Sequence, residues 1–316
     1  MDKKLTDLGK AFLIGLNGSE KSIPSRFLYD QIGDALFQEI MALPEYYLTR
    51  TEFDLLTEHA ASILSFVDAN KSLQLIELGA GDGIKTKILL RKLLEMKTEV
   101  EYLPIDISGN ALDSLKNSVL QEFPGLKIFP QQAEYFEALE ILKVKTLKQK
   151  LVLFLGSNIG NMTLEEMQVF LKQINQNLNK GEYVLIGFDL VKAPETILAA
   201  YNDKAGVTKE FNLNLLRRMN RELGANFDLN KWKHAPIFDE KQQAALSFLE
   251  STEQQTIHFE ELSLNVEFKA GEKISTERSQ KFTVSQIREY AQLAGFEEVM
   301  NFKSLDFEYV CALWKV

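Results

Sequence analysis

Short apolar runs alternate with amphipathic stretches from about Ser72 onward. The apolar runs predict five β-strands, at Leu73–Leu78, Glu101–Ile105, Lys127–Pro130, Leu151–Leu155 and Tyr183–Phe188. Between most of them, apolar residues have the spacing of amphipathic helices, at Lys85–Glu95, Gly109–Glu122 and Leu164–Leu178. Strands that alternate with helices in this way form βαβ units. The pattern therefore predicts a doubly wound α/β fold with a mostly parallel sheet.

This alternation breaks at Ala193 and resumes after about Ile274. The interval holds helical stretches and then alternating runs such as Thr256–Phe268, which predict antiparallel strands. After it, we expect a helix at Ser285–Ala294 that ends at Gly295, a residue type common just after helices. Two more strands are predicted to complete the sheet, at Glu297–Phe302 and Phe307–Trp314.

Composition and charge narrow the possible functions. The formal net charge is −9, which disfavours a nucleic-acid partner, and the lysines between Lys143 and Lys150 are interpreted as the solvated end of a helix. The single cysteine, Cys311, and three scattered histidines indicate neither a disulfide nor a metal site. Without a signal peptide or a long apolar span, we expect a cytoplasmic monomer that does not contact membranes.

The first candidate chemistry lies where the strand at Leu73–Leu78 ends. The sequence from Glu77 to Gly83, ELGAGDG, leads from strand to helix through glycines, which let a ligand touch the backbone. A dinucleotide fingerprint requires G-x-G-x-x-G, but Ile84 occupies the position of its third glycine. The glycines instead fit E-x-G-x-G, the pattern of proteins that bind S-adenosylmethionine.

Polar residues after the next strands favour the same ligand. Asp106 follows the second strand, where a carboxylate can accept hydrogen bonds from both hydroxyls of a ribose. Glu134 and Tyr135 follow the third, where a polar residue beside an aromatic ring can hold an adenine. The fourth strand leads into the small and amide residues Gly156–Asn161, where we expect the substrate. Asn161 itself can be a specificity contact or a loop cap.

Five parallel strands followed by a helix and a strand pair are similar to class I, Rossmann-like methyltransferases. We therefore expect a seven-stranded, mostly parallel sheet in a cofactor-binding domain formed by residues 61–190 and 284–316. Residues 1–60 and 191–283, the N-terminal helices and the insertion, are expected to form a second, α+β domain that binds the substrate. A length of 316 residues also favours two domains over one.

Four blocks in order resemble the histidine-specific Nα-methyltransferases of ergothioneine biosynthesis, which convert histidine to hercynine. The blocks are Phe27–Asp30 with Leu36–Phe37 and Leu43–Glu52, then Phe154–Asn161, then Asp189–Lys192 with Ala200–Asp203 and Phe211–Asn214, and finally Thr276–Phe282. The likeness covers nearly the whole chain. It implies that S-adenosylmethionine is the methyl donor, S-adenosylhomocysteine the product, and that the α-amine of histidine is methylated in three successive SN2 transfers.

The resemblance also implies roles for individual residues. Asn161 and Tyr201 would hold the substrate carboxylate, and Glu277 with Ser279 the imidazole nitrogens. An amide and a phenol can donate hydrogen bonds to a carboxylate, and a carboxylate such as Glu277 can accept one from an imidazole N–H. The implied substrate pocket is completed by Tyr46, Phe37, Gly156, Asn158 and Ser247. The implied cofactor residues are Tyr29, Gly79, Lys85, Asp106, Glu134 and Tyr135. No residue is identified as a general base.

Four residues depart from the family pattern. Glu134-Tyr135 replaces Asp-Phe, and Asn158 replaces threonine, both with similar roles. Ser247 stands where relatives have a methionine that packs on the imidazole, and a smaller residue would leave a roomier pocket. Methylation of another amino acid or small amine on the same fold is therefore an alternative. A non-catalytic, cofactor-binding regulatory protein is a second alternative, for which loss of Asn161 or Tyr201 would be expected.

Overall fold

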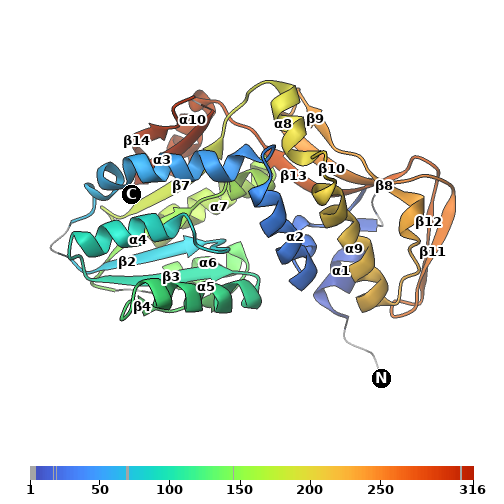
Figure 1. The fold of residues 1–316 in the computed structure, drawn as a ribbon, viewed down its shortest axis with the longest axis horizontal. Coiled ribbons are helices and arrows are strands. Elements are labelled where there is room, and N and C mark those ends of the chain that lie inside the picture. The colour runs from blue at the N-terminus through green and yellow to red at the C-terminus, as the bar shows by residue number, and fades with distance from the viewer. Residues whose placement is uncertain (1–4, 17, 19, 69–70, 145, 307) are drawn as a thin grey trace. The chain divides into compact units, whose positions relative to one another are not determined.

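The computed structural model describes residues 5–316 except residues 17, 19, 69–70, 145 and 307 (Figure 1). The chain divides into two compact units: unit 1 is Met1–Tyr46 with Ala193–Ser279, and unit 2 is Tyr47–Lys192 with Gln280–Val316. The expected boundary at residues 60 and 61 differs from this division, because it falls inside helix α3 (Tyr47–Leu64). The apolar face of α3 packs in the core of unit 2, so this helix belongs to the sheet domain.

Unit 2 is built on an eight-stranded sheet. Its strands are β2 (Leu73–Leu78), β3 (Val100–Asp106), β4 (Lys127–Ile128), β5 (Gln131–Gln132), β6 (Gln149–Phe154), β7 (Tyr183–Asp189), β14 (Glu297–Lys303) and β15 (Tyr309–Lys315). Seven of them follow the order β14-β15-β7-β6-β2-β3-β4, and β5 also pairs with β3. Strands β2 to β7 pair in parallel, whereas β15 is antiparallel to both β7 and β14.

The prediction of seven strands is corrected by β5. A single strand was expected at Lys127–Pro130, but the structure has two short strands, β4 and β5, with Pro130 between them. Proline has no backbone N–H to donate, which interrupts a ladder at that position. The mostly parallel sheet with its C-terminal strand pair agrees with the expected class I methyltransferase fold.

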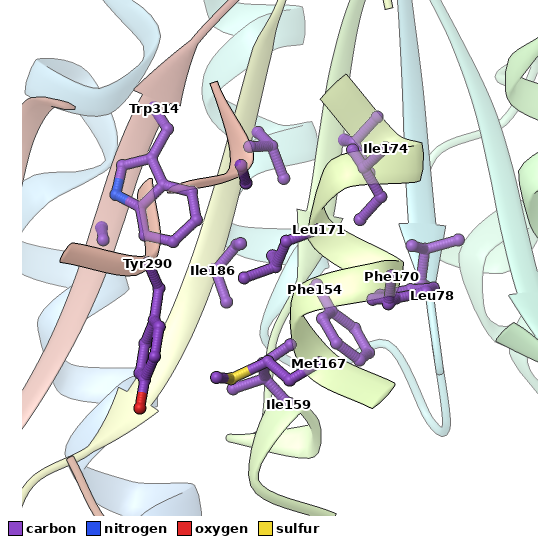
Figure 2. Packing of buried hydrophobic residues seen from close by; sticks show 14 of the residues in the cluster. Leu78, Phe154, Ile159, Met167, Phe170, Leu171, Ile174, Ile186, Tyr290 and Trp314 are labelled. Atoms are coloured by element: carbon purple, nitrogen blue, oxygen red, sulfur yellow. The ribbon is translucent and has the colours of Figure 1, made fainter. Parts of the chain in front are cut away.

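Helices cover both faces of this sheet (Figure 1). They are α3, α4 (Thr86–Glu95), α5 (Gly109–Glu122), α6 (Tyr135–Leu142), α7 (Leu164–Asn177) and α10 (Val284–Ala294). The first three pack on one face and the last three on the other. Figure 2 shows the second face, where Phe170 and Leu171 of α7 lie against Phe154 and Ile186 of the sheet. A sheet buried on both faces requires nearly continuous apolar strands, and every residue of β7 is buried.

The order of the strands reverses between β2 and β6. Strands β2 and β6 are parallel neighbours in the sheet. From β2 the chain continues to β3 on one side of this pair, and from β6 it continues to β7 on the opposite side. In open α/β sheets, ligands bind beyond the carboxyl ends of the strands at such a switch point. The loops that follow β2, β3 and β6 are therefore where a ligand is expected.

Unit 1 combines helices with two smaller sheets. Its helices are α1 (Asp7–Leu16), α2 (Gln31–Ala42), α8 (Pro194–Tyr201) and α9 (Val207–Leu223), and its strands are β1 (Lys21–Ser22), β8 (Trp232–His234), β9 (Ile237–Asp239), β10 (Ala244–Ser251), β11 (Gln255–Phe259), β12 (Leu264–Phe268) and β13 (Lys273–Gln280). One sheet has the order β1-β13-β10-β8, with β9 also paired to β10. Strands β11 and β12 form an antiparallel pair where Thr256–Phe268 predicted one.

The core of unit 1 is rich in phenylalanine. Phe12, Phe211, Phe259 and Phe268 are each no more than 1% exposed and belong to one apolar cluster. Helix α9 is buried around most of its middle, residues 211–216, so this helix supplies much of the cluster. In the part of the chain that the structure describes, no helix is long and apolar enough to cross a membrane.

Candidate functional site

The loop after β2 has a backbone that favours glycine. Gly79 and Gly81 have φ angles of +74° and +53°, in the left-handed region. A Cβ on Gly79 would lie 2.8 Å from Nδ2 of Asn158 and 2.9 Å from Oη of Tyr135, whereas one on Gly81 would meet nothing within 4 Å. Gly79, Tyr135 and Asn158 therefore lie together, and the backbone at Gly81 is open to a ligand.

Asp106, the last residue of β3, lies against the same loop. Its Oδ2 accepts a hydrogen bond from the N–H of Gly81 at 2.9 Å, and its Oδ1 accepts one from the N–H of Ser108 at 2.9 Å. Burial raises the pKa of Asp106, although these two N–H groups act in the opposite direction. Each carboxylate oxygen has a second lone pair, so the group can still accept hydrogen bonds from a diol.

Glu134 and Tyr135 begin helix α6. Glu134 is its N-cap and forms a capping box with Glu137, which fixes the first turn. The ring of Tyr135 packs edge-on against Phe154 of β6 at a centroid distance of 5.0 Å. The phenol is thereby held beside Gly79, with its aromatic face fixed by the core.

The loop after β6 carries three of the predicted residues. Gly156 and Ser157 have φ angles of +77° and +55°, and a left-handed serine is uncommon. Ser157 is held in place because its Oγ accepts a hydrogen bond from the N–H of Asp189 at 3.1 Å. A 3₁₀ turn then runs from Asn158 to Asn161. Both asparagines are half-buried, and the structure brings Asn158 next to Gly79 and Gly156.

Lys85 is the N-cap residue of α4, and its ammonium lies 3.3 Å from the position that a Cβ on Gly156 would take. It forms an ion pair with Glu52, a fully buried residue of α3. Burial lowers the pKa of Lys85, but the adjacent Glu52 carboxylate outweighs this effect and holds that pKa above its usual value. In unit 2, Gly79, Lys85, Asp106, Tyr135, Gly156 and Asn158 thus gather at the carboxyl ends of neighbouring strands.

Glu52 was not predicted as part of the site. Two signals in the sequence point to it. It interrupts the apolar stripe of α3, four residues after Leu48 and three before Leu55, where a charged residue is unexpected. Gly187 likewise interrupts the apolar run of β7, and a Cβ there would lie 2.1 Å from Oε1 of Glu52.

In unit 1, the predicted aromatic residues form one continuous cluster. Ring centroids are 5.4 Å apart for Tyr29 and Phe37, 6.1 Å for Phe37 and Tyr46, and 6.4 Å for Tyr46 and Tyr201, each pair nearly edge-on. Phe211 of α9, which was not predicted, contacts both Tyr29 and Phe37. These rings come from two distant stretches of the sequence, residues 29–46 and 201–211, so only the fold brings them together.

Tyr201 connects this cluster to strand β13. Its hydroxyl donates a hydrogen bond to Oγ of Ser279 at 2.7 Å, and both residues are buried. Glu277 lies two residues before Ser279, so both side chains lie on the same face of β13. The aromatic cluster, Ser279 and Glu277 therefore form a coherent group within unit 1.

Ser247 of β10 lies beside Thr276 of β13. Thr276, on the face of β13 opposite to Glu277, donates a hydrogen bond to the carbonyl of Ser247 at 3.0 Å. The Ser247 side chain is 1% exposed, and its hydroxyl finds no hydrogen-bond partner among the described residues. Within the same residues, no group of three His, Cys, Asp or Glu side chains is arranged to hold a metal ion.

Comparisons with known proteins identify the family. The model of the family described as histidine-specific methyltransferase, SAM-dependent, matches residues 8–316. The chain is 35% identical to histidine N-alpha-methyltransferase of Mycolicibacterium smegmatis, over 90% of this chain and 87% of that protein. It is 31% identical to ergothioneine biosynthesis protein 1 of Neurospora crassa, over 88% of this chain and 31% of that protein. A third relative, N-methyltransferase dtpB of Aspergillus flavus, is 26% identical over 98% of this chain and 88% of that protein. The chain therefore belongs to the family of histidine-specific, S-adenosylmethionine-dependent methyltransferases.

Proposed function

We propose that this S-adenosylmethionine-dependent N-methyltransferase transfers three methyl groups to the α-amine of L-histidine and forms hercynine. Family membership makes the chain an enzyme, which displaces the alternative of a non-catalytic regulatory protein. The observation that carries the proposal is the hydrogen bond from Tyr201 to Ser279 at the end of the aromatic cluster. It joins two residues to which the family resemblance separately assigns the carboxylate and the imidazole of one substrate.

The residues at the carboxyl ends of β2 and β3 fit S-adenosylmethionine. The open backbone at Gly81 leaves room for a ligand, and Asp106 beside it can accept hydrogen bonds from the two ribose hydroxyls. Tyr135 offers a ring to the adenine, and Glu134 a carboxylate to its edge. Gly79 and Lys85 then lie near the methionine portion in this proposal.

The proposed amino-acid contacts follow from hydrogen-bond chemistry. Asn161 and Tyr201 carry an amide and a phenol that can donate to a carboxylate. Glu277 accepts from an imidazole N–H, and Ser279 can donate or accept at the other ring nitrogen. Tyr46, edge-on to Tyr201, supplies an apolar wall for the same substrate.

The chemistry of transfer requires a neutral amine in line with the methyl group. Bound S-adenosylmethionine supplies an electrophilic methyl group on a sulfonium. The aromatic rings of Tyr29 and Phe37 are proposed to face the amine and its growing set of methyl groups. Aromatic rings attract a quaternary ammonium through cation–π contact, which permits successive transfers. A neighbouring positive charge lowers the pKa of an amine, so no dedicated base is required.

A second candidate is methylation of another amino acid or small amine. Ser247 favours it, because its buried hydroxyl has no hydrogen-bond partner among the described residues. The family resemblance implies a methionine at this position. A buried hydroxyl without a partner costs free energy that a polar substrate group can recover. A substrate with a hydrogen-bonding group at this position is therefore the alternative to histidine.

Mass spectrometry tests both candidates at once. The purified chain is incubated with S-adenosylmethionine and each of the twenty amino acids, and the products are examined for one, two or three added methyl groups. Trimethylation of histidine alone supports the proposed function. Methylation of a different amino acid supports the second candidate, and no methylation of any amino acid would contradict the assignment of an amino-acid substrate.

A further inference from the structure

Glu52 is a buried carboxylate on which several elements of unit 2 converge. Its Oε2 accepts hydrogen bonds from the ammonium of Lys85 at 2.5 Å and from the N–H of Gly156 at 2.7 Å. Its Oε1 accepts one from the hydroxyl of Tyr309 at 2.9 Å, and the thiol of Cys311 lies 3.8 Å away. A helix and the last strand of the sheet are thus tied to two loops at the cofactor end of the sheet.

Because Glu52 is buried, its charge requires these partners. Its side chain is 0% exposed, and an unpaired charge at such a position would cost several kcal/mol. Burial, followed by the charge of Glu52, raises the pKa of Tyr309, so this phenol stays a donor. Glu52 therefore has a charge partner and two further donors, and its geometry is fixed.

Glu52 also fixes the groups to which it is bonded. The N–H of Gly156 is held at the first of two successive left-handed residues, so the hydrogen bond helps to maintain a turn that Ser157 disfavours. The ammonium of Lys85 would otherwise be free to rotate on a four-carbon side chain. Both Gly156 and Lys85 are proposed to lie at the ligand.

The charge of Glu52 has a separate effect. S-adenosylmethionine carries one more positive charge than S-adenosylhomocysteine, on its sulfur. An uncompensated Lys85 ammonium would therefore disfavour the substrate relative to the product. Lys85 also experiences the charges of Glu77 and Asp82, but each of them acts on it less than Glu52 does.

We propose that Glu52 is a positioning residue of the cofactor site, which holds Lys85 and Gly156 in place and cancels the Lys85 charge so that the cationic methyl donor is accepted. This inference rests on the proposed placement of S-adenosylmethionine beside Gly79 and Lys85. It predicts that Glu52 changes the preference between the two forms of the cofactor, an effect that a purely structural residue would not have.

The test measures dissociation constants of S-adenosylmethionine and S-adenosylhomocysteine for the full chain by isothermal titration calorimetry. We expect Glu52→Gln, which keeps the shape but removes the charge, to raise the ratio of the two constants by about threefold or more against the methyl donor. Lys85→Met should change the ratio in the opposite direction, because it leaves the negative charge uncompensated. The double variant Glu52→Gln/Lys85→Met should return the ratio to within about twofold of the wild-type value.

Tyr309→Phe is the matched control, because it removes one hydrogen bond to Glu52 and leaves the ion pair. We expect it to lower the melting temperature without changing the ratio. If Glu52→Gln does not fold, the opposite shift in Lys85→Met and its reversal in the double variant still test the proposal. Unchanged ratios in the folded variants, with normal wild-type binding, would overturn this inference alone. A wild-type chain that binds neither compound would overturn the proposed cofactor site as well.

Discussion

Gly187 and Glu52 share a space that admits only one side chain. Gly187 lies on β7 and Glu52 on α3, and a Cβ on Gly187 would come within 2.1 Å of Oε1 of Glu52 and 2.5 Å of the hydroxyl of Tyr309. The glycine thus allows a carboxylate to lie directly on the sheet. Since both neighbours are buried and hydrogen-bonded, neither can move aside without breaking a contact.

We expect Gly187→Ala to lower the free energy of unfolding by about 3 kcal/mol, because the added methyl group overpacks a closed site. Denaturant unfolding followed by circular dichroism measures the change. Gly9→Ala in α1 is the control, since a Cβ there meets nothing closer than 3.4 Å. A helical glycine replaced by alanine should be neutral or stabilising by up to about 1 kcal/mol. Equal effects of the two substitutions would contradict the proposed steric conflict.

A second prediction concerns Glu77, the acidic residue before the glycine loop. Burial raises the pKa of Glu77 from 4.5 to about 7, against the hydrogen bonds that it accepts from Thr86 and Tyr102. The folded chain therefore binds a proton between these two pH values that the unfolded chain has released. Stability from this group is present below pH 4.5 and is lost as the pH rises toward 7.

Glu77→Gln should remove this dependence. From pH 5.5 to pH 8, we expect the stability of the cofactor-free variant to improve relative to wild type by about 2 kcal/mol. Urea unfolding at the two pH values measures the difference. Glu289→Gln, at an exposed position of α10, should follow the wild-type curve. If the variant and wild type change in parallel, Glu77 does not titrate in this range.

Lys150 corrects the interpretation of residues 143–150 as a solvated helix end. Lys143 does end α6 at an exposed position, but Lys150 is buried on β6, and Lys145 lies outside the described residues. The Lys150 ammonium donates hydrogen bonds to the carbonyls of Leu142 at 2.6 Å and Val144 at 3.0 Å. It thereby satisfies carbonyl groups that the end of α6 leaves without intrahelical partners.

Replacing Lys150 by methionine should therefore cost about 2 kcal/mol of unfolding free energy, because the buried carbonyl of Leu142 and the part-buried carbonyl of Val144 lose their donor. Lys143→Met is the matched control, since its ion pair with Glu140 is exposed. Such pairs contribute at most about 0.5–1 kcal/mol. Thermal unfolding of both variants distinguishes the two lysines, and a larger loss in Lys143→Met would refute the capping role of Lys150.

Parallel strands and their helices could be predicted because apolar spacing reports directly on burial. The predicted helix at Gly109–Glu122 agrees with α5 residue for residue, and the predicted strand at Leu73–Leu78 agrees with β2. The range of helix α6 was not predicted, although a helix was expected to end near Lys143, because eight residues after a short strand show too little periodicity. Its capping box, Glu134 with Glu137, was the available signal.

Individual residues of the candidate site were predicted, but the contacts between them were not. Glycine and aspartate at the ends of β2 and β3 are visible in a sequence, because the chemistry of a ligand demands these residue types there. The contact of Gly79 with Asn158, or of Glu52 with Gly156, joins residues about 80 and 104 positions apart. Only sheet order brings such residues together, and a single sequence does not disclose sheet order.

The hydrogen bond between Tyr201 and Ser279 provides the sharpest test of the amino-acid site. Under the proposed function, each of Tyr201→Phe and Ser279→Ala should raise the KM for histidine roughly tenfold, since each removes a buried hydrogen-bonding group. Because both changes delete the same bond, the double variant should lose less than the sum, with a coupling energy of about 1 kcal/mol. Steady-state kinetics at saturating S-adenosylmethionine measures the cycle, and the KM for S-adenosylmethionine should stay unchanged. Tyr183→Phe, a phenol of unit 2 at the start of β7, should leave the KM for histidine as it is. Strictly additive losses would mean that the two hydroxyls act on the substrate independently, and an unchanged KM for histidine in all variants would remove both from its site.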